Sequence, residues 1–406
     1  MHSATHSATR HAETNHAPLS PVAPRDPALD GVRGLAILIV VVHNASWIED
    51  SQATLPLKLF MAIAATGWVG VTLFFVLSGV LITGILLDTR DEPHYFRSFY
   101  MRRTLRIFPL YYVFLALVFT LGPYLVHDAA WRESVHDQRF WYWAYLSNWR
   151  AGIEGLPQFW SLAVEEQFYL VWPLLVFVLG GRRLLWLAIA MIATGPLIRY
   201  GLRFEGLQQG AYEFTIARWD ALAVGAAIAV LLRHPPGQAW LERNAARAGA
   251  ALVGALLVLV VFNRGFHAGE LVVDVLGQSL VALFFGALVV MSIVPRGTTE
   301  ASVRRFMSAG WLRFFGTYSY AIYVFHATLH RVARVYLVDV VNRGGTTERL
   351  LRLVAYDAAI LGASLLLALG SWHLLEKHAL RLKDRLAPGF TRFRLPTFTS
   401  SPSGSS

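Results

Sequence analysis

The sequence contains no cysteine, which excludes a disulfide framework, a thiolate metal site and a cysteine nucleophile. Charged residues make up only 15% of the 406 residues, which is low for a soluble enzyme. The net charge of +10 comes from arginines that lie between apolar runs and at their ends, as in the loops of membrane proteins. We therefore expect neither a nucleic-acid partner nor a bound metal ion.

The apolar content is correspondingly high, with 55% hydrophobic residues and a mean hydropathy of +0.46. These values predict an all-α, polytopic membrane protein. Ten apolar stretches are each long enough for a membrane helix. They cover residues 29–47, 67–88, 106–126, 160–180, 184–200, 213–232, 246–263, 270–293, 311–337 and 351–375. A short aromatic run, 140–149, is expected at the membrane interface or in a re-entrant segment.

Polar segments flank these stretches at both ends. Residues 1–28 repeat His-Ser-Ala-Thr and then carry several prolines, which predicts a disordered tail. The Pro-, Ser- and Thr-rich residues 386–406 predict a second tail, so the membrane domain is expected to span 29–385. An even number of spans places both termini on one side, and the arginine excess there indicates the cytoplasmic side.

The first apolar stretch opens with Leu29-Asp30-Gly31-Val32-Arg33-Gly34 and ends at His43. At about 1.5 Å per residue His43 lies roughly 20 Å from Leu29, past the middle of a hydrocarbon core about 30 Å thick. An imidazole at that depth is unfavourable unless it faces a partner or a polar cavity, so His43 is a candidate general base. A histidine that only hydrogen-bonds a backbone carbonyl near the headgroups is the alternative.

Basic residues gather just before the third apolar stretch. Arg102 and Arg106 are four residues apart and share a helix face, with Arg103 beside them. Such a donor cluster is suited to phosphate. An ordinary cytoplasmic anchor that contacts anionic lipid is the alternative.

The fourth stretch opens with Ser161, Glu165 and Glu166, of which the first two share a helix face one turn apart. A charged side chain at the centre of a membrane costs about 2.5–3.5 kcal/mol on insertion scales. The helix dipole stabilises a carboxylate near the N-terminus by only about 0.3–1 kcal/mol, so it does not offset the cost of two buried carboxylates. We expect one carboxylate to face a polar cavity and the other to lie at the interface.

Other ionisable residues also fall within apolar stretches. Arg218 and Asp220 are two residues apart and do not face each other on a helix, so each is expected to meet a partner on another helix. His326 is a second imidazole within an apolar stretch, and it is a candidate for substrate contact or structural support.

These stretches, together with Gly70 to Thr83 and Phe315 to His326, follow the order seen in the acyltransferase 3 family of bacterial membrane O-acyltransferases. The chain resembles this family from Leu29 to about Lys377. The resemblance implies transfer of an acyl group, often acetyl, from cytoplasmic acyl-coenzyme A to a hydroxyl of a glycan, a lipid-linked sugar or a similar acceptor. It implies these roles: His43 and Arg33 in catalysis, Arg102, Arg103 and Arg106 at the donor, and Ser161 with Glu165 as a Ser-x-x-x-Glu motif.

One spacing departs from the family pattern. Family members commonly carry ten residues between the arginine and the histidine, whereas nine lie between Arg33 and His43. On a helix the two side chains then point about 80° apart instead of about 20°. Asn44 takes the usual histidine position, and an amide cannot act as a general base.

The resulting hypothesis is direct transfer within a bacterial inner-membrane protein. The donor's phosphates rest on the arginine cluster, and His43 takes the proton of the acceptor hydroxyl while Glu165, or otherwise Asp220, orients the imidazole. The rival hypothesis is a transporter or flippase, because buried His, Arg and acidic residues also build proton relays. The sequence shows no internal repeat of the kind that many transporters carry.

Overall fold

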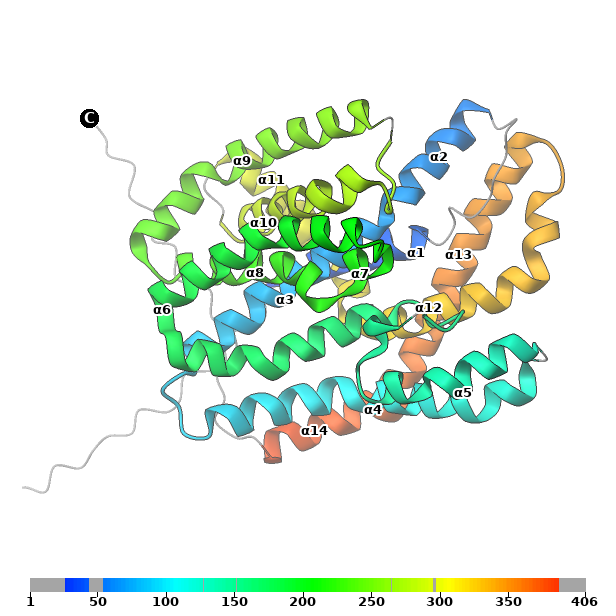
Figure 1. Ribbon diagram of the computed structural model, residues 1–406, viewed down its shortest axis with the longest axis horizontal. Helices are drawn as coiled ribbons and strands as arrows, with labels where there is room; N and C mark the ends of the chain where they lie inside the picture. Colours follow the sequence, from blue (N-terminus) through cyan, green and yellow to red (C-terminus); the bar gives the residue numbers. More distant parts are fainter. Residues whose placement is uncertain are drawn as a thin grey trace, which may run out of the picture.

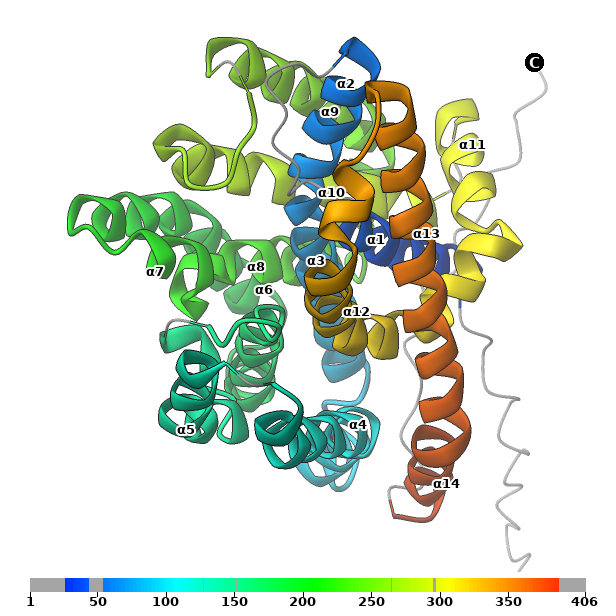
Figure 2. The ribbon, with the colours of Figure 1, turned by 90° about the vertical axis from the view of Figure 1, so that its right-hand side faces the viewer.

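The computed structural model of the protein describes residues 26–43, 54–126, 128–150, 152–263, 265–294 and 297–386. Within these ranges the chain is helical and forms no β-strand, as the composition predicts. The long helices are α1 (Pro27–His43), α3 (Val69–Asp88), α4 (Tyr95–Leu125), α6 (Phe159–Phe204), α8 (Thr215–Leu231), α9 (Pro235–Phe262), α10 (Gln278–Ile293), α12 (Gly310–Asn342) and α13 (Thr346–Ser371). Most of them run roughly along one direction and form a bundle, which α13 crosses steeply (Figures 1 and 2).

Shorter elements connect the long helices or cap the bundle. They are α2 (Leu55–Ala65), α5 (Ala129–Trp143), α7 (Gln208–Glu213), α11 (Thr298–Met307) and α14 (Lys377–Leu386). Two 3₁₀ turns, η2 (Thr66–Trp68) and η3 (Ser147–Trp149), and two π-helical turns, η4 (Val273–Gly277) and η5 (Trp372–Glu376), complete the set. Of the predicted tails 1–28 and 386–406, residues 1–25 and 387–406 lie outside the described residues, whereas residues 27–28 belong to α1 and Leu386 ends α14.

Helix α6 doubles back on itself (Figure 1). Its halves meet at Gly180, whose φ of 63° and ψ of −176° are not helical and whose positive φ favours glycine. Arg90 secures the turn by donating two hydrogen bonds, of 2.7 and 3.1 Å, to the carbonyl of Phe177. The predicted stretches 160–180 and 184–200 are therefore two spans joined without a loop.

The predicted number of spans is recovered in this way. Seven helices in the described ranges are long and apolar enough to cross a membrane. One of them is α6, which counts twice, and the 17-residue α1 and the 33-residue α12 join them as members of the bundle. Together these make the ten apolar helices that the sequence predicts.

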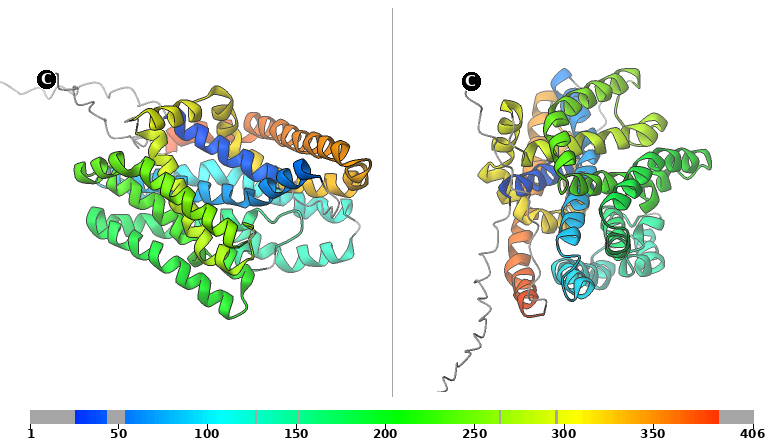
Figure 3. Two further views of the ribbon diagram at one scale, coloured as in Figure 1. Left: turned by 90° about the horizontal axis from the view of Figure 1, so that it is seen from above. Right: turned by 90° about the vertical axis from the view of Figure 1, so that its left-hand side faces the viewer.

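Glycines allow the central helices to approach closely. A methyl group at Gly34 of α1 would strike the Leu312 carbonyl of α12, and one at Gly79 of α3 would strike the Leu222 carbonyl of α8. Small residues at such crossings are the usual device of membrane helix packing. Helices α1 and α3 thus lie in the middle of the bundle, with α9 and α13 outside them (Figures 2 and 3).

Several boundaries differ from the sequence prediction. The second span begins earlier than residue 67, because α2 and η2 lead directly into α3. The aromatic run 140–149 forms the end of α5 and the turn η3, and it lies beside the middle of α4, where Tyr111 and Tyr112 donate hydrogen bonds to the carbonyls of Tyr142 and Trp143. Helix α1 starts two residues before the expected boundary, since Asp26 accepts a hydrogen bond from the Ala28 amide and pairs with Arg304 at 3.0 Å.

Candidate active site

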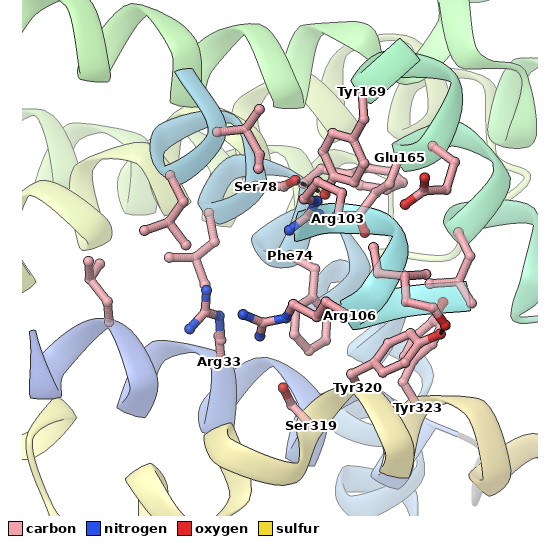
Figure 4. Close-up of a pocket in the computed structure, with 18 of the residues that line it drawn as sticks. Arg33, Phe74, Ser78, Arg103, Arg106, Glu165, Tyr169, Ser319, Tyr320 and Tyr323 are labelled. Carbon is pink, nitrogen blue, oxygen red and sulfur yellow. Dashed lines mark hydrogen bonds between the residues drawn. The ribbon is translucent and has the colours of Figure 1, made fainter. Parts of the chain in front are cut away.

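A cavity of about 560 Å³ opens between α1, α3, α4, α6, α12, the π-helical turn η5 and α14. Its size falls in the range typical of ligand sites, about 300–1,000 Å³. The charged and hydroxyl-bearing predicted site residues that line it are Arg33, Arg102, Arg103, Arg106, Ser161, Glu165 and Glu166. The structure therefore gathers seven of the predicted residues from three helices into one place (Figure 4).

The arginines supply positive charge to the cavity. Arg102, Arg103 and Arg106 lie on α4, and their spacing turns all three toward the cavity. Arg33 of α1 and Arg106 extend toward each other across the space (Figure 4). Arg33 also pairs with Asp30 at 2.9 Å. Guanidinium groups converging from two helices form the kind of donor set that binds phosphate.

Glu165 is held by hydroxyl groups on neighbouring helices. Ser78 of α3 and Tyr169 of α6 hydrogen-bond to each other, and both also hydrogen-bond to Glu165. The guanidinium carbon of Arg103 lies 4.0 Å from the centre of the Tyr169 ring. Glu165 is therefore fixed in a polar cluster beside a cation, which is the environment that a buried carboxylate requires.

The expectation that only one of the two glutamates faces a cavity is wrong. Glu166 lines the same cavity as Glu165 and also interacts electrostatically with Arg103. One of its carboxylate oxygens is buried and has no hydrogen-bond partner among the described residues. Two neighbouring carboxylates can share the cavity because four arginines balance their charge there.

Ser161 lies deeper on α6 and contacts α12. Its hydroxyl is 2.5 Å from the hydroxyl of Tyr323, and it donates a hydrogen bond of 3.0 Å to the Gln158 carbonyl. The Tyr323 ring also packs edge-on against Phe74 of α3, with centroids 6.0 Å apart. The hydrogen bond between Ser161 and Tyr323 therefore links α12 to the Ser-x-x-x-Glu segment of α6.

His43 is not among the described residues that line the cavity. It ends α1, and ten residues of helix place it about 15 Å beyond Arg33 along the axis. Its Nδ1 is 2.9 Å from the Ala64 carbonyl, which can only accept, so Nδ1 carries a proton there and Nε2 is the acceptor nitrogen of the neutral ring. The imidazole is thus oriented by a backbone carbonyl and is in the tautomer that a general base needs at Nε2.

His326 lies close enough to His43 for the two rings to interact electrostatically. Gly34 of α1 lies beside Gly316 of α12, and the two histidines follow at similar distances along the two helices, nine residues further on in α1 and ten in α12. His326 is buried, and its Nδ1 is 2.7 Å from the Tyr323 carbonyl. It is therefore in the same tautomer as His43 and does not line the cavity.

Asp220 and Arg218 meet partners on other helices, as their spacing predicts. Asp220 pairs with Arg199 of α6 at 2.9 Å and accepts a hydrogen bond of 2.5 Å from Ser279. Arg218 bonds to Gln278 of α10 and Thr72 of α3. The Nδ1 nitrogen of His43 meets the Ala64 carbonyl, so the partner of the imidazole at that nitrogen is a backbone carbonyl and not Glu165 or Asp220.

Sequence reasoning missed several cavity residues. They are Ser78, Tyr169, Tyr320, Tyr323 and Glu376. Hydroxyl side chains in apolar helices carry no signal of which neighbour they meet, whereas Glu376 was detectable as an acid near a helix end. Its position in the π-helical turn η5 is a further indication, because such turns occur often at functional sites.

Comparison with known proteins agrees with this arrangement. The sequence profile of a family described as an acyltransferase domain matches residues 26–370, most of the chain. The protein therefore belongs to this acyltransferase family, the acyltransferase 3 family that its motifs resemble.

Curated relatives carry more specific names. The chain is 28% identical over 322 residues to the peptidoglycan O-acetyltransferase OatA of Listeria monocytogenes, covering 74% of this chain and 48% of that protein. It is 27% identical over 335 residues to YrhL of Bacillus subtilis, provisionally named a peptidoglycan O-acetyltransferase, with the same coverage. The chain spans about half the length of these relatives. No solved structure matches it significantly.

Proposed function

We propose that the protein is a membrane O-acyltransferase that moves an acyl group, acetyl in the first instance, from acyl-coenzyme A to a hydroxyl of a glycan or lipid-linked sugar. The observation that carries this proposal is the cavity in which four arginines surround Glu165 and Glu166. The family membership and the names of the O-acetyltransferase relatives support it. The acyl donor is a substrate, and the proposed chemistry uses no metal.

The cavity is assigned to the donor. Arg102, Arg103 and Arg106 line it and would hold the phosphates of coenzyme A. The long arm of the donor then extends along α1 past Arg33, toward the level of His43. Residues 29–385 would form the transferase domain, in the bacterial inner membrane with both termini on the cytoplasmic side, because the arginine-rich ends of the spans lie there.

His43 is assigned as the general base. Its Nε2 takes the proton of the acceptor hydroxyl as the oxygen attacks the thioester carbonyl, the carbon–sulfur bond breaks, and the departing thiolate receives a proton. The Ala64 carbonyl would hold the ring in the tautomer that this step requires. His326 would support the site from beside the imidazole, and Ser161 would support it from the wall of the cavity.

The test is acetyl-coenzyme A binding and turnover by the purified protein in detergent, with matched variants. Arg103→Ala should abolish binding, whereas Arg243→Ala, an exposed arginine of α9, should leave it unchanged. His43→Ala should retain binding and lose turnover, whereas His267→Ala, on an exposed loop, should retain both. A folded wild-type protein that binds no acyl-coenzyme A would refute the proposal and favour the transporter hypothesis.

A further inference from the structure

Arg218 occupies an aromatic box inside the bundle. Its side chain is 1% exposed, and its guanidinium carbon lies 5.5, 5.8 and 5.4 Å from the ring centres of Phe75, Trp160 and Tyr212. Its hydrogen bonds go to neutral oxygens, the side-chain carbonyl of Gln278 and, at 2.8 Å, the hydroxyl of Thr72. A buried cation is thus surrounded by aromatic faces and uncharged acceptors.

Two other arginines in the same half of the bundle form ion pairs with aspartates, unlike Arg218. Arg199 pairs with Asp220 at 2.9 Å, and Arg203 pairs with Asp274 at 3.1 Å. Those two carboxylates act on Arg218 only at longer range. A buried charge without a paired countercharge is unfavourable, and at membrane depth it indicates a functional site.

Buried N–H donors around the box lack partners. Among the described residues these donors are the Nε of Arg218 and the indole nitrogen of Trp68. Gln278 bonds Arg218 directly, and the Trp68 ring meets the Tyr212 ring edge-on at 6.2 Å. Each of these groups needs an acceptor oxygen, and buried donors are rarely left without one. A ligand that brings oxygens with negative charge would satisfy the donors and the arginine together.

We propose that Arg218 and these donors bind an anionic group of the acceptor, a carboxylate or a phosphate. The inference rests on the proposed function and names the acceptor as an acidic one. Phe75 lines the donor cavity, and its ring also lies beneath Arg218, so the box adjoins the floor of that cavity. The donor's phosphates have their own arginines in the cavity, which leaves Arg218 for the second substrate.

Two further aromatic rings at the box lie on short segments of the chain. Tyr212 belongs to the short helix α7, and Phe266, which stacks on Trp68 at 5.3 Å, belongs to the segment between α9 and η4.

The experiment compares Arg218→Gln with Arg199→Gln in thermal melts of the purified protein and in acetyl transfer. The glutamine at 218 should keep or raise the melting temperature, because it removes an uncompensated charge, and transfer to membrane acceptors should fall roughly 10- to 100-fold. Acetyl-coenzyme A binding should be unchanged. Arg199→Gln should lower the melting temperature, because it leaves Asp220 unpaired.

Three small probes identify the anion. Sodium glucuronate tests for a carboxylate and glucose 6-phosphate for a phosphate, with glucose as the neutral control. At least one of the two anions should raise the melting temperature of the wild type and not of Arg218→Gln. If Arg218→Gln melts as early as Arg199→Gln and no probe shifts the wild type, Arg218 is structural and the inference is overturned. Failure of acetyl-coenzyme A to bind the wild type would instead refute the proposed function.

Discussion

Substitutions of Tyr169 separate two contributions to the site, the contact of its ring with Arg103 and the hydrogen bond of its hydroxyl to Glu165. Its ring lies under the Arg103 guanidinium, while its hydroxyl joins Ser78 in holding Glu165. Tyr169→Phe removes only the hydroxyl and leaves buried partners without a hydrogen bond, a loss of about 1–3 kcal/mol. If that loss falls on the transition state, turnover drops roughly 5- to 150-fold, while donor affinity stays unchanged because the ring remains.

Tyr169→Leu removes the ring as well. A cation over an aromatic face is worth about 0.5–2 kcal/mol, so donor binding should weaken a further 2- to 30-fold, approximately. Calorimetric titration with acetyl-coenzyme A measures the affinity, and release of free thiol measures turnover. Ser78→Ala is the matched control, since it removes the same hydrogen bond from the other side and should behave as Tyr169→Phe does. Equal losses of donor affinity in Tyr169→Phe and Tyr169→Leu would refute this division.

Three further predictions address packing, charge and the contact with α12. Gly79→Ala should lower the free energy of unfolding by about 1–3 kcal/mol, because the new methyl group meets the Leu222 carbonyl. Gly254→Ala, on an open face of α9, should not lower it, and thermal melts of the two variants test the difference. Glu376→Gln removes a carboxylate that acts on Arg106, so donor binding should tighten severalfold at low salt and less at high salt; an unchanged dissociation constant contradicts this. Tyr323→Phe and Ser161→Ala each break the hydrogen bond to α12, so the double variant should transfer no more slowly than the slower single variant.

Features of the structure that depend on a local run of residues could be predicted from the sequence, and other features could not. Apolar runs are local, so the ten spans could be counted from the sequence. Two adjacent spans fused into α6 because Gly180 makes a turn without the polar loop that marks most span ends. Short amphipathic elements such as α11 and α14 were missed because they carry no apolar run.

The candidate site was predictable where the chemistry lies on one helix. The arginines of α4 and the Ser161–Glu165 pair share a face by spacing alone, and the structure places them in one cavity. Contacts between helices depend on packing that a single sequence does not reveal. The partners of Glu165 on α3 and of Asp220 on the second half of α6 are such contacts, and so is the Ala64 carbonyl that orients His43.

Helix α1 gives the proposed reaction a fixed length scale. Glycine contacts at Gly34 and Gly316 press it against α12, and Gly70 brings α3 against its other side, so it has no room to slide. Arg33 faces the cavity and His43 ends the same rigid rod about 15 Å further on. On the proposed assignment α1 is a molecular ruler. If the arm between the phosphates and the thioester were shorter than that distance, the thioester would not reach His43 while the arginines hold the phosphates. The enzyme would therefore select donors first by the length of this arm and only then by the acyl group.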